Sequence, residues 1–308
     1  MGGSTSARDE TAAANRVDRV RISPMGADSP ASDAGRSASD DELLIAARQG
    51  DAAALEMLLI RYQPSLYRFG LRMCGNVDEA GDVAQESLIS MARSLPDFRG
   101  DSSVSSWLYT IARRFCIKKR RRSKFAPAGE ESLEPSGTGV RHLADPAPNP
   151  EETAANRELS TVLSQAIDAL DPSQREVLVL RDVEGLSARE VARILGESVD
   201  AVKSRLHRAR MAVRQKLAPT FGHPATESAR RPGCPDVLRL LSQHLEGEID
   251  PDVCASMEAH LTQCSHCRDA CESLKRTLAM CRELPTPEVP APLAASIKAA
   301  IRTLLSQS

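Results

Sequence analysis

The sequence predicts an all-α protein, in which two helical blocks and a small helical block rich in cysteine and histidine are joined by flexible linkers. Aromatic residues make up only 3% of the 308 residues, which disfavours a β-sandwich or barrel because strands depend on aromatic and β-branched side chains. Helical periodicity with recognisable caps covers much of the chain. At about 100–200 residues per domain, the length allows two domains or three small ones.

The N-terminal part is predicted to be a leader followed by the first block. Residues 1–38 are rich in Ala, Ser, Gly and Asp without sustained periodicity, which is typical of disorder. Ser39 and Glu42 form a capping box that opens the first block, residues 39–122. The helical segment 78–95 carries an apolar stripe. Its opposite face carries Glu79, Asp82, Gln85 and Glu86.

The second block has the outline of a helix-turn-helix. Residues 123–155 mix prolines, glycines and acids, which predicts a flexible acidic linker. In the second block, residues 156–218, Asp171 and Pro172 start one helix, and a second capping box starts the next. A helix, a tight turn containing glycine and a longer helix then follow in order.

The C-terminal part contains a second linker, a Cys/His block and one more helix. These are residues 219–232, 233–285 and 286–308. The last helix is amphipathic and interrupted by Lys298 and Arg302, so we expect it to pack against the protein. No run reaches the roughly 18 apolar residues of a membrane span, and no secretory signal is recognisable. We therefore expect a cytoplasmic protein without a membrane partner, whose eight cysteines are thiols or metal ligands.

The net charge of −2 hides two basic segments without acids. Eight positive charges lie between Arg113 and Lys124. Six lie on the long helix of the second block: Lys203, Arg205, Arg208, Arg210, Arg214 and Lys216. Two such helices favour contact with one polyanion, although solvated helix faces are the alternative.

We expect the second block to bind duplex DNA and the first block to bind single-stranded DNA. The second helix of a helix-turn-helix meets base edges in the major groove with its early residues. Those residues here are Ser198, Asp200, Lys203, Ser204 and Arg205, with Arg208 nearer the backbone. Eight of the nine aromatic residues lie in or directly after the first block. Aromatic rings can stack on unpaired bases while nearby positive charges contact the phosphates, which favours binding of single-stranded DNA. We expect Tyr67 and Phe69 to be core residues, whereas Phe98 and Trp107 fit either role.

Ordered motifs in the two blocks resemble the bacterial sigma-70 family, specifically its extracytoplasmic-function (ECF) type. They are Gly75–Ala80 with Asp82–Glu86, Phe98–Gly100 with Ser106–Arg113, and Leu170–Pro172 with Gly185–Ala192. The resemblance implies that the first block is sigma region 2 and the second block is region 4. It implies that Asp82, Gln85 and Glu86 bind core RNA polymerase. It assigns the −10 promoter element to Phe98, Arg99, Trp107, Arg113, Arg114, Lys118 and Lys119, and the −35 element to the helix-turn-helix. The chain departs from the family in having Leu88, Ile89 and Met91 where an aromatic pair is usual.

The Cys/His block carries a metal-binding spacing. His260-x3-Cys264-x2-Cys267 places three ligands within reach of one ion, and Cys234 can supply a fourth. The block resembles the zinc-binding anti-sigma domain, which would make the site closed and structural. Cys254, Cys271 and Cys281 are further candidate ligands, and the surplus of thiolates favours zinc, cadmium or copper. Reduced thiols without metal, and a catalytic zinc, are the alternatives.

The main hypothesis is an ECF sigma factor, not an enzyme, which binds core RNA polymerase and promoter DNA and is regulated in cis by its metal-binding block. Between Asp236 and Glu288 there are ten acids and five bases, so this block could mask the basic helices. Whether metal masks or releases them, and whether a separate anti-sigma partner exists, stays open. The alternative is an autonomous helix-turn-helix regulator with a structural zinc domain. A zinc hydrolase is a third hypothesis, for which no base is placed.

Overall fold

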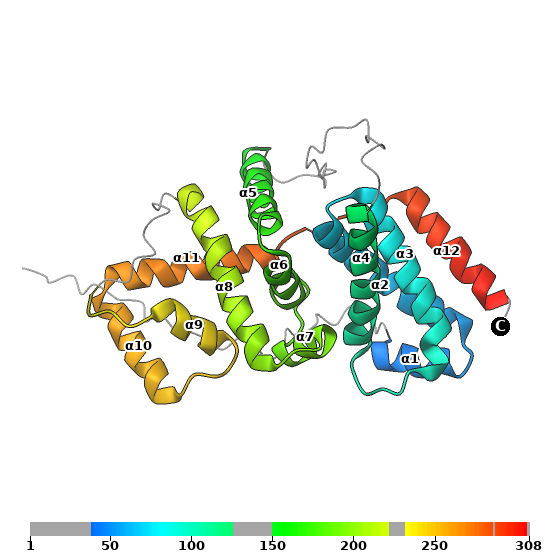
Figure 1. Cartoon of the computed structure of the whole chain (residues 1–308), viewed down its shortest axis with the longest axis horizontal. Coiled ribbons are helices and arrows are strands. Elements are labelled where there is room, and N and C mark those ends of the chain that lie inside the picture. The colour runs from blue at the N-terminus through cyan, green and yellow to red at the C-terminus, as the bar shows by residue number, and fades with distance from the viewer. Residues whose placement is uncertain (1–37, 126–149, 222–231, 286, 307–308) are drawn as a thin grey trace, which may run out of the picture.

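The computed structural model describes residues 38–125, 150–221, 232–285 and 287–306. The regular elements within these ranges are all helices, which confirms the predicted all-α class (Figure 1). Residues 1–37 of the predicted leader and the central parts of both predicted linkers lie outside the described residues. No helix in the described ranges is both long and apolar enough to cross a membrane.

The first block packs its helices around a core that contains Tyr67 and Phe69, as expected. The helices are α1 (Asp40–Arg48), α2 (Ala52–Cys74), α3 (Val77–Ser94) and α4 (Val104–Phe125). The predicted capping box of Ser39 starts α1. Helices α2 and α3 lie so close that a Cβ at Gly70 would stand 2.9 Å from the Ala80 Cα, so this contact requires glycine.

The second block contains the helix-turn-helix, formed by α7 (Ala188–Leu195) and α8 (Val199–Leu217). Gly196, with a φ of 70°, ends α7 in the left-handed conformation that favours glycine. Before them come α5 (Pro150–Asp168), α6 (Pro172–Leu178) and a π-helical turn (Val179–Val183). Helix α5 begins inside the segment predicted as linker, because proline suits the first turn of a helix.

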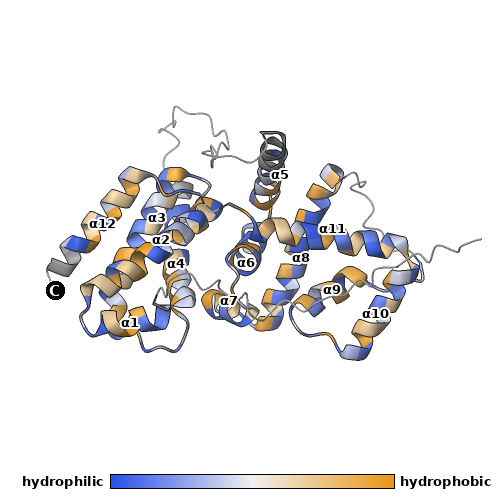
Figure 2. Ribbon diagram, turned by 180° about the vertical axis from the view of Figure 1, so that it is seen from behind, coloured by the Kyte–Doolittle hydropathy of each residue, from blue (hydrophilic) through white to orange (hydrophobic). Residues whose placement is uncertain are grey.

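The C-terminal part contacts both blocks. The Cys/His block consists of α9 (Val237–Leu245), α10 (Pro251–Gln263) and α11 (Ser265–Arg282), has its own small core, and packs on α8. The chain then crosses the molecule, and α12 (Ala291–Ser306) lies against α3 on the far side of the first block (Figure 1). The helices mix hydrophobic and hydrophilic residues, as expected for amphipathic packing elements (Figure 2).

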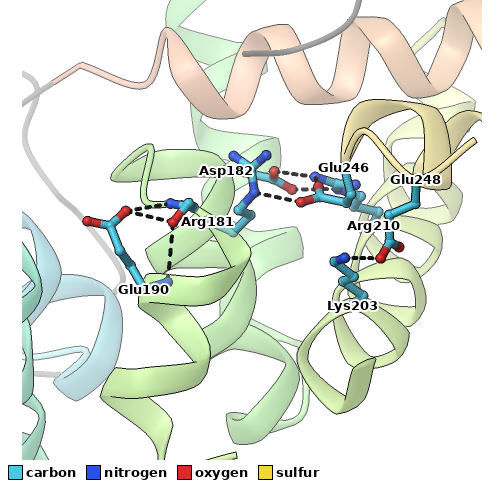
Figure 3. A network of polar contacts seen from close by, with 8 residues as sticks. Arg181, Asp182, Glu190, Lys203, Arg210, Glu246 and Glu248 are labelled. Carbon is cyan, nitrogen blue, oxygen red and sulfur yellow. Dashed lines mark hydrogen bonds and ion pairs between the residues drawn. The ribbon is translucent and has the colours of Figure 1, made fainter. Parts of the chain in front are cut away.

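A buried arginine joins the second block to the Cys/His block (Figure 3). The Arg210 guanidinium donates from Nε and Nη2 to the two carboxylate oxygens of Asp182, at 2.8 and 2.7 Å. It also donates to Oε1 of Glu246 at 2.8 Å, while Oε2 of Glu246 accepts from Arg181 Nε at 3.0 Å. Burial lowers the pKa of Arg210, but the carboxylates outweigh burial and leave the pKa raised. The network fixes the turn after α9 against the helix-turn-helix.

Two of the six basic residues of α8 are therefore not surface charges. Arg210 and Arg214 are only 1% and 6% exposed. The sequence expectation overcounted the basic surface because Asp182 and Glu246, which neutralise Arg210, come from other elements of the fold. The basic surface of α8 is left to Lys203, Arg205, Arg208 and Lys216.

We expect Arg210→Met to destabilise the protein by about 3–5 kcal/mol, because Asp182 would then be a buried charge without a partner. Arg208→Met, on the exposed side of the same helix, is the matched control and should change stability by less than about 0.5 kcal/mol. Urea unfolding followed by circular dichroism measures both. Equal midpoints for the two variants would contradict the assigned role of Arg210.

Candidate nucleic-acid interface and metal centre

The four predicted metal ligands come together where α10 meets α11. The ligand atoms of Cys234, His260, Cys264 and Cys267 all lie within 4.8 Å of one another. Cys264 stands between the two helices in an extended conformation, so His260 at the end of α10 and Cys267 in the first turn of α11 face the same point. Cys234 reaches them from the segment before α9.

This donor set fits a tetrahedral zinc ion. Zn–S bonds of about 2.3 Å place two sulfurs roughly 3.8 Å apart, and Cys234 Sγ lies 3.9 Å from Cys264 Sγ. The Nε2 atom of His260 is buried without a hydrogen-bond partner, which is expected of a ligand nitrogen. Burial and the neighbouring thiols raise the pKa of Cys267 to about 12, whereas hydrogen bonding, chiefly with the Cys267 backbone, lowers the pKa of Cys264. Four protein ligands complete a tetrahedral set, which favours a structural site over a hydrolytic one.

The three further candidate cysteines lie outside this cluster in the described structure. Cys271 is buried in the core of the Cys/His block, and Cys281 is buried in the larger core that the first and second blocks share. Cys254 Sγ lies 3.6 Å from Nδ1 of His244. The structure thus separates the predicted quartet from the additional thiols.

Helix α8 presents the residues predicted to read the −35 element. Ser198 caps the helix by accepting a hydrogen bond from the Ala201 N–H at 3.2 Å. Arg205 forms an ion pair with Glu197, at 2.9 Å, in the turn before the helix. The exposed members of the predicted set are Ser198, Asp200, Ser204 and Arg208.

The turn after α9 covers one edge of this helix. Lys203 forms an ion pair with Glu248, two residues after Glu246 (Figure 3). His207 Nδ1 lies 2.9 Å from the Ser242 hydroxyl of α9, and burial lowers the pKa of His207. Residues Glu246, Gly247 and Glu248 form this turn, which we call the Glu-Gly-Glu turn. The sequence indicates only that the block resembles the anti-sigma domain, and the structure adds that both glutamates contact the helix-turn-helix.

The residues predicted for the −10 element divide into buried and exposed sets. The Phe98 ring is buried, and its centroid lies 4.5 Å from that of the Trp107 ring. Phe98 is therefore a core residue that packs against Trp107, which is itself half-buried. Arg113 Nε donates to Glu176 Oε1, at 2.8 Å, in the second block. The exposed basic members are Arg99, Arg114 and Lys118.

The residues predicted to bind polymerase lie along α3. Asp82 is exposed and forms an ion pair with Lys119, one of the residues predicted for the −10 element. Gln85 and Glu86 are half-buried on the same helix. The three side chains thus share one helix, as their spacing predicts.

Helix α12 lies on this part of α3. A Cβ at Gly81 would stand 3.2 Å from Cδ2 of Leu293, so the two helices are in close contact there. Gln85 Nε2 donates to the Ser296 hydroxyl at 3.5 Å, a long hydrogen bond. The amphipathic pattern of α12 predicted packing, but nothing in the sequence named α3 as its partner.

Three family models match consecutive parts of the chain. The model for Sigma-70 region 2 matches residues 58–125, and the model for Sigma-70, region 4 matches residues 160–213. The model described as "Putative zinc-finger" matches residues 234–268, which include all four clustered ligands.

Curated relatives match the first and second blocks. The RNA polymerase sigma-H factor of Pseudomonas aeruginosa is 33% identical over 184 residues, which cover 58% of this chain and 94% of that protein. The ECF RNA polymerase sigma-E factor of Escherichia coli K12 is 33% identical over 187 residues, which cover 59% of this chain and 95% of that protein.

Among solved structures, that of CnrH in complex with the cytosolic domain of CnrY is 26% identical, with a TM-score of 0.43, and covers 58% of this chain and 96% of that one. The sigma factor RpoE in complex with the anti-sigma factor NepR from Bartonella quintana is 23% identical, with a TM-score of 0.42. That match covers 53% of this chain and 95% of that one.

We expect the purified chain to hold about one zinc-class ion per molecule, because four ligands complete a tetrahedral site. His260→Ala should lose the ion, since it opens the ligand set, while Cys254→Ser should keep it. Elemental mass spectrometry of the purified proteins measures both. Retention by the His260 variant, or loss from the Cys254 variant, would contradict the ligand assignment.

Proposed function

The chain belongs to the ECF type of the sigma-70 family, and from this premise we propose that it directs core RNA polymerase to promoters under the control of its own metal-binding block. Sigma factors are transcription initiation factors that bind core polymerase and promoter DNA, so the chain is not an enzyme. The observation that carries the proposed regulation is the contact of Glu246 and Glu248 with the helix-turn-helix. The expected cytoplasmic location stays a prediction.

Helix α8 is proposed to read the −35 element in the major groove. Arg205 is suited to bridge a guanine through two hydrogen bonds, which is worth about 1–3 kcal/mol of discrimination. Lys203 and Arg208 are suited to neutralise phosphates, and Ser198, Asp200 and Ser204 are suited to polar contacts near the helix start. The exposure of four of these six residues supports this assignment.

Helix α4 and the loop before it are proposed to hold the opened −10 element. Arg99, Arg114 and Lys118 are exposed and can follow the phosphates of a single strand. The half-buried Trp107 offers a ring face for stacking once its neighbours move. Phe98 is proposed to support Trp107 from the core side, because it is itself buried.

The Cys/His block is proposed to mask α8 by offering carboxylates in place of phosphates. Glu248 pairs with Lys203, a residue that DNA would otherwise contact. Glu246 anchors the same turn through the buried Arg210 and the half-buried Arg181. Because the mask and the DNA use the same cation, they compete for it.

The metal is proposed to hold this mask in place. When bound, zinc would cross-link the segment before α9 to the junction of α10 and α11, and the Glu-Gly-Glu turn lies between those points. We therefore propose that the zinc-loaded protein is the masked form. Cadmium or copper would bind the same thiolates with other preferred geometries, and would therefore also change how the Cys/His block covers α8.

The autonomous helix-turn-helix regulator remains the competing function. It differs from the sigma factor in one respect that can be measured, because it requires no polymerase.

A sigma factor uses α3 to bind core polymerase, and α12 lies against α3 next to Gln85. We propose that α12 limits access to this helix.

Glu248→Gln should raise specific transcription about two- to fivefold, because it frees Lys203 at the cost of one partly exposed ion pair. Asp252→Asn, a nearby exposed acid of α10, is the control that should leave transcription unchanged. Run-off transcription with core polymerase on fragmented genomic DNA, read by sequencing, detects specific transcripts from whichever promoters the protein uses. Specific transcripts absent from every variant and every metal state would contradict the sigma function itself.

Ile297→Asp should release α12, because Ile297 is 2% exposed in the shared core, and should tighten binding of core polymerase by about tenfold. Ala299→Asp, on the exposed side of α12, should not change it. Pull-down with core polymerase measures both. Substituting Asp82 and Glu86 should abolish the interaction, and binding that survives this change would favour the autonomous regulator.

A further inference from the structure

A cavity of about 270 Å³ lies between α2 and α12, and it shares no lining residue with the metal centre or with the helix-turn-helix. Its wall consists mainly of apolar side chains from both helices: Leu59 and Ile60 of α2, and Ala294, Ile297 and Ile301 of α12. An apolar cavity of about 150 Å³ is large enough to hold benzene. This cavity therefore has room for an aromatic ring with a substituent.

One polar side chain in the wall of the cavity has an unused hydrogen-bond donor. Gln63 of α2 is 8% exposed, and its Nε2 is buried without a hydrogen-bond partner among the described residues. A buried donor without an acceptor costs free energy. The last side-chain torsion of a glutamine has a broad range, so a small rotation turns this amide towards the cavity that Gln63 lines. A ligand that carries an acceptor would satisfy it.

The residue after Gln63 leaves an acceptor in the same part of α2 without its usual donor. Pro64 lies inside the helix and has no N–H, so it cannot donate the regular helical hydrogen bond to the carbonyl of Ile60. Ile60 and Gln63 both line the cavity. A hydroxyl group can accept from an amide and donate to a carbonyl. These two groups therefore favour a ligand with a hydroxyl over a purely apolar one.

The charged side chains that line the cavity are paired with each other. Glu56 Oε1 lies 3.4 Å from Lys298 Nζ, and the two side chains are 26% and 48% exposed. Arg302 lies 3.8 Å from the same carboxylate oxygen. Burying a charge requires a partner of opposite sign, and the rest of the wall supplies none. The ligand that fits this wall is therefore neutral.

We propose that this cavity binds a small neutral aromatic alcohol of the phenol class, and that the bound molecule holds α12 on the first block. The wall comes from both α2 and α12, so the ligand binds only while α12 is docked. A ligand that binds one of two forms shifts the population towards that form. Because α12 lies against α3 next to Gln85, the bound phenol lowers the affinity of the chain for core polymerase. This effect on polymerase rests on the proposed role of α12, whereas the binding of the phenol does not.

The binding test uses the full-length chain and two probes of similar size. The first is 4-methylphenol, and the second is 1,4-dimethylbenzene, which has a methyl group in place of the hydroxyl. Titrations followed by ligand-observed NMR give the dissociation constant of each probe. Gln63→Leu, which keeps the size of the side chain, should weaken 4-methylphenol about tenfold through the lost hydrogen bond. The same variant should bind 1,4-dimethylbenzene at least as tightly as the wild type, which also shows that the cavity is intact.

A second pair of variants tests the position of the site. Ala294→Phe places a ring in the cavity and should abolish binding of both probes. Ala299→Phe, on the exposed side of the same helix, is the matched control and should bind both probes like the wild type. The proposal is overturned if the wild type binds neither probe saturably, if Gln63→Leu weakens both probes equally, or if Ala294→Phe still binds them.

Pull-down with core polymerase, with and without saturating 4-methylphenol, tests the effect on α12. The phenol should reduce polymerase binding several-fold in the wild type and leave it unchanged in Ala294→Phe. If the phenol binds but polymerase binding is the same with and without it, the part of the proposal that concerns α12 is wrong. If the phenol binds and no variant directs transcription in any metal state, the proposed function fails while the binding site stands.

Discussion

The arrangement of this protein depends on how one buried arginine is neutralised. Arg210 belongs to the helix that is proposed to enter DNA, yet it points inward and meets Asp182 within its own block. Glu246 of the Cys/His block then joins the pair and also binds Arg181, which makes a balanced group of two cations and two carboxylates. If Glu246 departs, Arg210 keeps Asp182 as its partner, so no buried charge is left without compensation. The Cys/His block can therefore bind and leave without unfolding the block beneath it.

Carboxylates make the main contacts with basic residues between the parts of this protein. Glu248 covers Lys203 on the helix-turn-helix, and Glu184 covers Arg68 between the blocks. These glutamates offer the same chemistry as DNA phosphates, and polymerase and promoter would compete with them for the same cations. An exposed ion pair contributes little to stability on its own. We therefore infer that the buried pairs fix how the blocks are oriented, and that the exposed pairs determine how easily the blocks separate.

The sequence predicted local features well because they obey short-range rules. The capping boxes, the glycine at 196 and the spacing of the metal ligands each depend on residues a few positions apart, and the structure reproduces them. The burial of Arg210 could not be predicted, because its partners lie 28 and 36 residues away on other elements. The same reason applies to Glu184 and Arg68, which are 116 residues apart. For α12, periodicity predicted an apolar face but carried no information about which helix would cover it.

We propose that bound metal keeps the Cys/His block in place, so that Glu248 holds Lys203 of the DNA-reading helix. The rate at which an acylating reagent modifies Lys203, measured by mass spectrometry, reports on this contact, with the exposed Lys216 of the same helix as internal reference. In the zinc-loaded protein, Lys203 should react several times more slowly than Lys216, because its ammonium is held by Glu248. In the His260→Ala variant, the two lysines should react at similar rates. The same slow modification of Lys203 with and without the metal site would contradict the account.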